Sequence, residues 1–391
     1  MTAKVGNPLF RDMPTTVFEV MSQLALKHKS INLGQGFPDD RGPPDVLQAA
    51  ADALLNGYNQ YPSMMGTPEL RQAVANHAKR FYGLDVDWAR EILVTSGATE
   101  ALGACLFGLI EPGDEVVLFE PMYDSYLPII RQAGGIPKLV TLKAPDWSFT
   151  REDLERVFSP RTKALVINDP LNPVGKVYRR DELELIGEFL QRFDAYAVCD
   201  EVYEHLVFDG HRHLPLANYP GMAGRTVTIS SAAKMFNCTG WKIGWACGAA
   251  DLIAGVRAAK QYLSYVGGAP FQPAVAHALN TEQAWVAALR ESLQAKRDKL
   301  GSALADLGFE VHDSFGTYFL CADPRPLGYH DSTEFCAQLP QRAGVAAIPM
   351  SAFCDPGADH ADAWNHLVRF AFCKRDETLD EAIRRLSVLR K

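Results

Sequence analysis

The middle of the chain alternates short apolar runs with longer amphipathic stretches. The apolar runs are typical of buried strands, which we expect at Ile92–Thr95, Glu115–Phe119, Ala164–Asn168, Ala195–Cys199 and Val227–Ser230. The amphipathic stretches predict helices at Glu100–Leu109, Tyr123–Ala133 and Asp181–Phe193. Because continuously apolar strands alternate with helices, the pattern predicts an α/β fold whose mostly parallel sheet is covered on both faces.

The last third of the chain follows a different pattern. A long helical region begins near Pro273 and continues through Gln283–Leu307. Shorter strand-like pieces and a closing helix follow, at Thr317–Cys321, Val345–Ile348, His366–Phe372 and Thr378–Leu389. We therefore expect a large domain over residues 47–280 and a smaller one formed from both chain ends, residues 1–46 and 281–391.

Composition excludes several classes of protein. A length of 391 residues suits two lobes, and a formal charge of −8 argues against nucleic-acid binding, which needs a basic surface. The longest apolar run, Ala101–Ile110, is about half of a bilayer span. The first 21 residues resemble no export signal, and the eight cysteines form no CxxC pair. We therefore expect a cytoplasmic protein with free thiols, no membrane contact and no metal site.

A lysine and an aspartate each follow a buried strand. Lys234 comes just after Thr226–Ser231, in a small-residue turn where burial favours the neutral, nucleophilic amine. Asp200 closes its strand at the carboxyl end, where open α/β sheets bind ligands. Such an acid can pair with a protonated ring nitrogen and stabilise charge spread into that ring. Taken singly, a solvated lysine and a helix N-cap are the simpler interpretations.

Two loops that follow strands offer amide and backbone N–H groups. The turn Thr95–Glu100 joins a strand to a helix, and free N–H groups at a helix N-terminus bind anions. Ser96 and Glu100 are also compatible with a capping box. In the loop 168–175, two steps into proline restrict the backbone, so that Asn172 is placed to present its amide to a phenolic oxygen. A plain turn is the alternative.

Two further cations lie in apolar surroundings. Lys242 stands between glycines and tryptophans in Thr239–Trp245, which indicates a backbone held close to an anion. Arg369 lies on the strand face opposite Val368 and Phe370, and arginine suits two-pronged capture of a carboxylate. A solvated lysine and a surface arginine are the alternatives.

Together these segments resemble the class I aminotransferases of fold type I along nearly the whole chain. The group that they resemble most contains kynurenine aminotransferase, glutamine transaminase K, cysteine-conjugate β-lyase and bacterial methionine aminotransferases. The segments that carry the resemblance are Asn32–Asp39, Asn59–Tyr61, Thr95–Glu100, Asn172–Lys176, Asp200–Tyr203, Ser231–Lys234 and Val368–Phe370. The resemblance implies pyridoxal 5′-phosphate as cofactor, a mostly parallel seven-stranded sheet, a smaller α+β domain, and a homodimer that shares its active sites across the interface.

The resemblance also implies roles for individual residues. The catalytic residues would be Lys234, which carries the cofactor as a Schiff base, Asp200, which pairs with its ring nitrogen, and Tyr203. Asn172 and Tyr203 would contact the ring oxygen, and Tyr123 would stack on the ring. The remaining cofactor contacts, mostly to the phosphate, would come from Gly97, Ala98, Thr99, Ser231 and Lys242, with Tyr61 from the partner subunit.

The same resemblance predicts how the substrate is held. Its carboxylate would meet Arg369 and the backbone at Gly36, and Asn172 would also contact the substrate. Candidates for an aromatic wall around its side chain are Phe18, Tyr61, Tyr123, Tyr265 and Phe353. Because we see no second arginine for a dicarboxylate, we expect a large neutral L-amino acid such as methionine, glutamine, kynurenine or an aromatic one. Some kynurenine-acting relatives have histidine at the position of Val266, and this difference weakens the assignment of kynurenine as the substrate.

The predicted reaction is a ping-pong transamination from that amino acid to a 2-oxo acid. A cysteine-S-conjugate β-lyase and an N-succinyldiaminopimelate transaminase are alternatives, because they share the same early chemistry. From another class, the chain could be a cofactor-binding regulator or a scaffold. The family pattern, which begins near Asn32, leaves no length for a DNA-binding segment, and a scaffold does not require Lys234, Asp200, Asn172 and Arg369 together.

Overall fold

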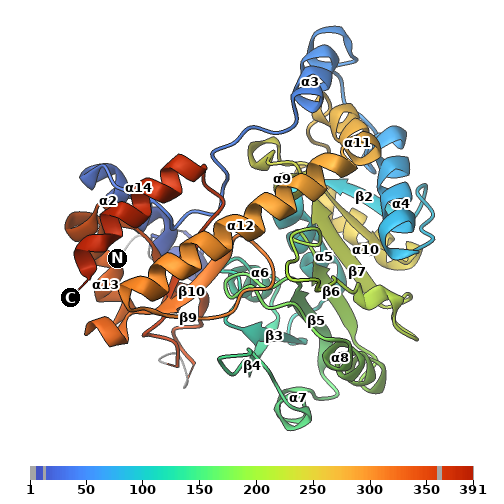
Figure 1. Cartoon of the computed structure of the whole chain (residues 1–391). Helices are drawn as coiled ribbons and strands as arrows, with labels where there is room; N and C mark the ends of the chain where they lie inside the picture. The colour runs from blue at the N-terminus through green and yellow to red at the C-terminus, as the bar shows by residue number, and fades with distance from the viewer. Residues whose placement is uncertain (1–5, 12–14, 359–362, 391) are drawn as a thin grey trace, which may run out of the picture.

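A computed structural model describes residues 6–11, 15–358 and 363–390. Parts of the first 21 residues, from which we expect no export signal, and parts of both predicted domain ends therefore lie outside the described residues. Figure 1 shows a large sheet-containing body and, beside it, a smaller body built from the blue and red ends of the chain.

A seven-stranded sheet forms the centre of the large body, in the order β2-β8-β7-β6-β5-β3-β4. Every strand is parallel to its neighbours except β8, which is antiparallel to β2 and β7. The mostly parallel seven-stranded sheet is therefore confirmed. The strands are β2 (Ile92–Thr95), β3 (Glu115–Glu120), β4 (Ile136–Thr141), β5 (Thr162–Asn168), β6 (Tyr196–Asp200), β7 (Thr226–Ser231) and β8 (Gly244–Gly248).

The five strands expected from the apolar runs are confirmed, but β4 and β8 are not among them. The edge strand β4 is only partly buried and carries a proline and a lysine, so it lacks a continuous apolar run. In β8 the glycines hide the pattern, and Gly244 has a packing reason. A Cβ on Gly244 would stand 2.7 Å from the Gly97 carbonyl carbon, so only glycine lets the two backbones meet.

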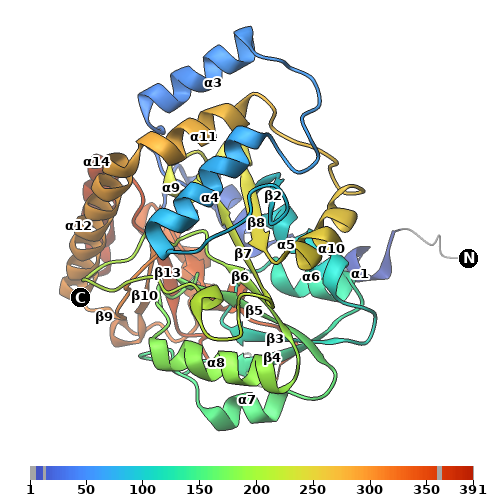
Figure 2. The same ribbon diagram turned by 90° about the vertical axis from the view of Figure 1, so that its right-hand side faces the viewer.

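Alternate residues of the central strands face two different helical layers. Val198 and Ile229 belong to the apolar cluster that includes α5 and α10 residues, whereas Ala197 and Cys199 belong to the cluster that includes α8 residues. Figure 2 shows these layers on the two sides of the sheet. The helices of the large body are α3 (Pro44–Asn56), α4 (Pro68–Tyr82), α5 (Gly97–Leu109), α6 (Tyr126–Gln132), α7 (Arg151–Val157), α8 (Arg180–Arg192), α9 (Ala232–Met235), α10 (Ala250–Lys260) and α11 (Phe271–Thr281).

The long helical region expected near Pro273 is two helices, α11 and α12 (Gln283–Leu307). The break falls at Glu282, whose ψ of 30° leaves the helical range. Just before it, the Thr281 hydroxyl donates to the His277 carbonyl oxygen at 2.9 Å, and side chains of this kind compete with helix continuation. In Figure 1, α12 extends from the large body to the small one.

The small body contains a four-stranded antiparallel sheet in the order β12-β13-β10-β9. Its strands are β9 (Glu310–Val311), β10 (Phe319–Asp323), β12 (Ile348–Pro349) and β13 (Val368–Ala371). The N-terminal segment joins it, because β1 (Ile31–Asn32) pairs in parallel with β11 (Val345–Ala346). The helices of the small body are α2 (Val17–His28), α13 (Ser332–Ala343) and α14 (Asp376–Leu386), whereas α1 (Pro8–Arg11) lies beside α6 of the large body (Figure 2).

The two-domain division stays a prediction. Its boundaries at residues 47 and 280 lie inside α3 and α11, so the elements themselves break nearer to Pro43 and Glu282. All eight cysteines are free thiols, as expected. Among the described residues, every helix is too short or too polar to span a bilayer.

Candidate active site

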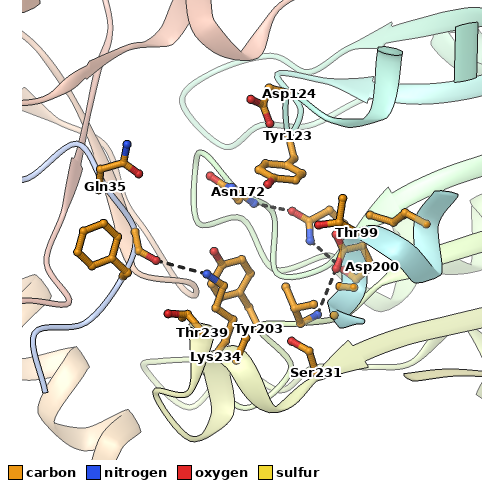
Figure 3. Close-up of a pocket in the computed structure, with 18 of the residues that line it drawn as sticks. Gln35, Thr99, Tyr123, Asp124, Asn172, Asp200, Tyr203, Ser231, Lys234 and Thr239 are labelled. Carbon is orange, nitrogen blue, oxygen red and sulfur yellow. Dashed lines mark hydrogen bonds between the residues drawn. The ribbon is translucent and has the colours of Figure 1, made fainter. Parts of the chain in front are cut away.

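A pocket of about 450 Å³ opens at the carboxyl ends of the central strands, within the size range of small-molecule sites (Figure 3). Residues of both bodies line it. Of the residues predicted for the site, those that line it are Phe18, Gly36, Gly97, Ala98, Thr99, Tyr123, Asn172, Asp200, Tyr203, Ser231, Lys234, Lys242 and Arg369. The structure thus brings together thirteen side chains or backbone positions that span most of the sequence.

Lys234 lies in the short helix α9, immediately after β7. Its Nζ donates to the Gly36 carbonyl oxygen at 3.3 Å, while the Tyr318 hydroxyl donates to the Lys234 carbonyl oxygen at 3.0 Å. Burial lowers the pKa of the Lys234 amine, because the charged form loses its water shell. A solvated surface lysine is therefore excluded, and the amine is suited to act as nucleophile and base.

Asp200 ends β6 on the pocket side of the sheet. Its carboxylate accepts from the Tyr126 hydroxyl at 2.8 Å and from the Val202 N–H at 3.4 Å. Burial raises the pKa of Asp200 to about 6, although the Tyr126 hydrogen bond works against that rise. The residues that follow form turns, so the helix N-cap interpretation is wrong. A buried carboxylate of this kind gains from a cationic partner.

The anion cradle predicted at 95–100 is the N-terminus of α5. Gly97 begins the helix at a φ of 75°, which favours glycine, and a Cβ there would stand 3.1 Å from the Lys242 Nζ. The Ser96 N–H donates to Glu100 at 2.6 Å, but the Ser96 hydroxyl lies toward Ser264 instead of capping the helix. Only half of the predicted capping box is therefore present. The backbone N–H groups of the first turn of α5 face the pocket beside Lys242, as an anion cradle requires.

Arg369 lies on β13 with 2% of its surface exposed, so the surface-arginine interpretation is wrong. Its Nη1 donates to Asn172 Oδ1 at 2.8 Å and its Nη2 donates to the Gly34 carbonyl oxygen at 2.7 Å. Its Nε–H is buried and has no acceptor among the described residues. A buried donor without an acceptor is costly, so this cation is prepared for an anionic ligand.

Aromatic rings hold the Arg369 guanidinium in place. Its central carbon lies 3.8 Å from the centroid of the Phe319 ring, 4.5 Å from that of Phe353 and 5.4 Å from that of Phe18. Burial lowers the pKa of Arg369 to about 10, which leaves it charged at neutral pH. Phe353, expected in the pocket wall, is buried behind the arginine, whereas Phe18 and Phe319 reach the pocket itself.

Asn172 is fixed from two sides. Its backbone N–H donates to Asn168 Oδ1 at 2.8 Å, and its own Oδ1 accepts from Arg369. Its amide NH₂ therefore remains for a ligand oxygen. Figure 3 shows Asn172 and Tyr123 above Lys234 and Tyr203, on opposite sides of the open space.

Tyr61 and Tyr265 lie outside the pocket of their own chain. Their rings pack edge to face with centroids 5.7 Å apart, and 78% and 49% of their surfaces are exposed. Tyr265 is held there by Lys260, whose Nζ donates to the Tyr265 carbonyl oxygen at 2.5 Å. The expectation that Tyr265 lines the substrate pocket is thus not met within one chain.

Sequence reasoning missed four residues that shape the site: Tyr126, Tyr318, Asp124 and Phe319. Tyr126 and Asp124 stand in the segment Tyr123–Tyr126, where only Tyr123 was considered. Asp124 lines the pocket, and burial raises its pKa despite the charge of Arg369. The cluster of aromatic and acidic residues just after the predicted strand 115–119 was a signal that could have identified them.

The fold and the pocket together define a class of enzyme. A mostly parallel sheet presents a buried lysine, a buried acid, an anion cradle and an arginine that lacks an acceptor. These groups fit pyridoxal 5′-phosphate, which has an aldehyde, a ring nitrogen and a phosphate, together with an amino-acid carboxylate.

Comparison with known proteins gives the same answer. The profile of the family "Aminotransferase class I and II" matches residues 28–386. The chain is 63% identical to a probable N-succinyldiaminopimelate aminotransferase of Mycobacterium tuberculosis, over 97% of each chain. It is 38% identical to the methionine aminotransferase of Escherichia coli, over 96% of each. The solved structure of the N-succinyldiaminopimelate aminotransferase from M. tuberculosis superposes with a TM-score of 0.95 at 62% identity, covering 98% of this chain and all of that one.

The chain belongs to the class I and II aminotransferases. It is a pyridoxal-phosphate-dependent enzyme that transfers an amino group between an amino acid and a 2-oxo acid. The cofactor, the reaction and the family expected from the sequence are thereby confirmed, and the regulator and scaffold alternatives are set aside.

Proposed function

We propose that this aminotransferase interconverts N-succinyldiaminopimelate and its 2-oxo acid. The observation that carries the proposal is the 63% identity, over nearly the full length, with a relative that is named for this substrate. The proposal replaces a large neutral amino acid as first choice and takes up an alternative that the sequence left open.

The pocket offers groups that suit such a substrate. The reacting end of the substrate carries a carboxylate. The Arg369 Nε–H has no acceptor among the described residues and can donate to this carboxylate. The other end of the substrate carries an amide. Gln35 and Asp124 line the pocket away from Lys234 (Figure 3). The Gln35 NH₂ already donates to Phe18 and Ser22, so the Gln35 Oε1 and the Asp124 carboxylate can accept from the N–H of that amide.

We assign the chemistry to residues of this chain. The bound cofactor supplies an electron sink for the negative charge that forms at the substrate Cα. Burial makes the Lys234 amine less basic, and this amine takes the proton from the substrate Cα and later returns it. Asp200 holds a positive charge at the ring nitrogen, and Tyr203 and the Asn172 NH₂ donate to the ring oxygen. Lys242 and the N–H groups of Gly97, Ala98 and Thr99 bind the phosphate, with Ser231 beside them.

A panel of amino donors tests the substrate. Purified enzyme is mixed with N-succinyldiaminopimelate, methionine, glutamine and kynurenine, and the change in cofactor absorbance is followed for each. We expect kcat/KM for N-succinyldiaminopimelate to exceed the others by at least about 100-fold, because its distal amide adds hydrogen bonds that the smaller donors cannot make. A higher value for methionine would overturn this proposal and restore the large neutral donor.

A β-lyase activity is tested on the same preparation. A cysteine conjugate is added, and thiol and pyruvate release are measured beside 2-oxo acid formation. We expect the oxo acid to dominate. Predominant thiol release would identify the enzyme as a β-lyase.

We also propose a homodimer with shared active sites, located in the cytoplasm. Large apolar side chains are exposed on two neighbouring segments: Leu54, Leu55, Tyr58 and Tyr61 on one, and Tyr262, Leu263 and Tyr265 on the other. The Tyr61–Tyr265 ring pair joins the two segments. An exposed apolar patch of this kind is typical of an interface, and a second copy would carry Tyr61 into its partner's pocket. The free cysteines suit a reducing compartment.

Subunit mixing tests the shared site. Lys234→Ala and Tyr61→Ala are each inactivating in the proposed arrangement, but a mixed dimer has one site with both changes and one site with neither. Unfolding and refolding an equal mixture should therefore restore about a quarter of the wild-type activity, because half of the dimers are mixed and each has one intact site. Activity no higher than that of the separate variants would contradict sharing through Tyr61.

A further inference from the structure

A second cavity, of about 310 Å³, lies on the opposite face of the large sheet from the active site. Consecutive residues of β7 face the two cavities: Ser231 lines the active-site pocket, and Ser230 lines the second cavity. At the end of β6, Asp200 likewise lines the active-site pocket, and the next residue, Glu201, lines the second cavity. Acidic and hydroxyl groups dominate the polar part of its lining, which includes Glu91, Glu201, Glu204, Tyr82, Thr228 and Ser230.

Two histidines and a glutamate meet at one side of this cavity. His77 comes from α4, and Glu204 and His205 come from the turn after β6. The Nε2 atoms of His77 and His205 are 2.7 Å apart, and one atom from each of the three side chains lies within 4.8 Å of the other two. His77 and Glu204 are buried, with 4% and 6% of their surfaces exposed, and both line the cavity.

The surroundings hold these three side chains in position. The Phe81 ring packs against both imidazoles, with centroids 4.9 Å from His77 and 4.6 Å from His205. One Glu204 oxygen accepts from the Ser230 hydroxyl at 2.5 Å. The buried Tyr82 hydroxyl also lies beside Glu204. An apolar shell and hydrogen-bonded outer partners are features of built metal sites.

We propose that His77, Glu204 and His205 bind a divalent transition-metal ion, with zinc the best fit. Two imidazoles and a carboxylate are a known protein ligand set for zinc, and the adjoining cavity gives room for a water as fourth ligand. The two nitrogens share a hydrogen bond of 2.7 Å, whereas roughly 3.3 Å separates two ligand nitrogens on a tetrahedral ion. Binding would therefore replace this hydrogen bond and part the rings slightly. The site was not expected from the sequence, because His77 is separated from the Glu204–His205 pair by 127 positions or more.

The ion would act on the enzyme from behind the sheet. Glu204 follows Tyr203, and its hydrogen-bond partner Ser230 precedes Ser231. Tyr203 and Ser231 both line the active-site pocket. The ion therefore joins α4 to the turn that carries Tyr203. We expect it to stabilise the fold without taking part in the reaction, which takes place on the active-site side of the sheet (the front face).

Zinc titration of the holoenzyme tests the site. The protein is dialysed against a chelator and then against metal-free buffer without phosphate, and zinc chloride is added in a calorimeter. We expect one ion per chain and a higher melting temperature with zinc than without it. The His77→Gln and His205→Gln variants should each bind at least tenfold more weakly. Wild-type protein that shows no saturable binding would overturn the proposal.

Three controls separate this site from other zinc binding. His277→Gln changes a second, partly exposed group formed with Asp45 and Glu282, and it should leave the one-equivalent binding unchanged. Lys234→Ala should also bind zinc like the wild type, because the active-site pocket lies on the other face. Cobalt(II) should give a visible absorption band of a low-coordinate site in the wild type and not in His77→Gln. Each variant's cofactor absorbance and metal-free melting temperature verify its fold, and equal zinc affinity in a folded His77→Gln variant would overturn the proposal.

Discussion

Buried charged side chains on the two faces of the large sheet differ in how closely a charge of opposite sign lies beside them. On the front face, Asp200 has few partners and a pKa raised to about 6, and the Arg369 Nε–H has no acceptor among the described residues. On the back face, the His213 ring lies between Asp169 and Glu201, with nitrogen–oxygen distances of 3.1 and 3.0 Å. Front-face charges are thus prepared for ligands, whereas these back-face charges neutralise one another.

The comparison teaches that burial alone does not mark a functional group. Both sets are buried, and Glu201 is the immediate neighbour of Asp200. What differs is whether each charge already has a partner of opposite sign. Front-face substitutions should therefore reduce activity and leave stability largely intact, whereas substitutions at His213 should do the reverse.

The largest effect is expected for Lys234→Ala. Loss of the amine removes both the covalent attachment and the proton carrier, so kcat should fall by at least about 10⁴-fold. The absorbance band of the attached cofactor should disappear, while the melting temperature of the cofactor-free protein stays close to that of the wild type. Lys27→Ala, at an exposed position of α2, is the matched control. A Lys234→Ala enzyme with wild-type turnover would refute the assignment.

Arg369→Lys should have the next largest effect. A lysine keeps the charge but cannot donate to Asn172 and Gly34 and also offer a free N–H to the substrate. We expect KM for the amino donor to rise by about 100-fold, in line with the loss of a charged hydrogen bond. Steady-state kinetics measure it, with Arg384→Lys on the exposed side of α14 as control. An unchanged KM would place the carboxylate elsewhere.

His213→Gln should affect stability more than activity. The substitution leaves Asp169 and Glu201 buried without their cation, which should cost roughly 3 kcal/mol. Burial alone would lower the pKa of His213, but Glu201 and Asp169 raise it well above its ordinary value. A raised folded-state pKa gives stability that is complete below the unfolded value and is lost as pH rises through the folded value.

The measurement for His213 is the melting temperature as a function of pH. Wild type should lose its advantage over His213→Gln as pH rises through the folded-state pKa of His213, and His330→Gln, at an exposed position, should follow the wild type. If His213→Gln lowered kcat strongly and left the melting temperature unchanged, the contrast between the two faces would be wrong.

The smallest effect is expected for Tyr126→Phe. The Tyr126 hydroxyl lowers the pKa of Asp200, so its removal should raise that pKa further above about 6. Because the charged carboxylate is the form that pairs with a cationic ring, cofactor affinity falls as pH drops through the Asp200 pKa. A lost hydrogen bond of about 1 kcal/mol should move this acid limb upward by about 0.7 pH units. Fluorescence titration of the cofactor-free enzyme measures it, with Tyr329→Phe as control, and an unmoved limb would contradict the role of Tyr126.

Much of this site was predictable because it lies where strands end. Asp200, Lys234 and the turn 95–100 each follow an apolar run that the sequence displays. The strand β8 was not predictable in the same way, because its glycines serve contact with Gly97 and not an apolar pattern. The break at Glu282 was also missed, since helix propensity continues across it.

Contacts that depend on the tertiary fold stayed hidden. Tyr126 reaches Asp200 from 74 positions away, and the Tyr318 hydroxyl reaches the Lys234 carbonyl from 84. Neither residue type is unusual in its own segment. The His77–His205 pair, 128 positions apart, was equally invisible. Periodicity reports which face of an element is buried, but not which distant element packs against it.

The hydrogen bond from Arg369 to Gly34 sets the order in which the two parts of the site can form during synthesis. The last strand of the large sheet is β8, so Lys234, Asp200 and the cradle at Gly97 can all be in place once Gly248 has left the ribosome. The hydrogen bond from Arg369 to the Gly34 carbonyl joins positions 335 apart and has to await β13. The growing chain can thus form its own part of the proposed cofactor site well before the Arg369–Gly34 contact of the proposed substrate site.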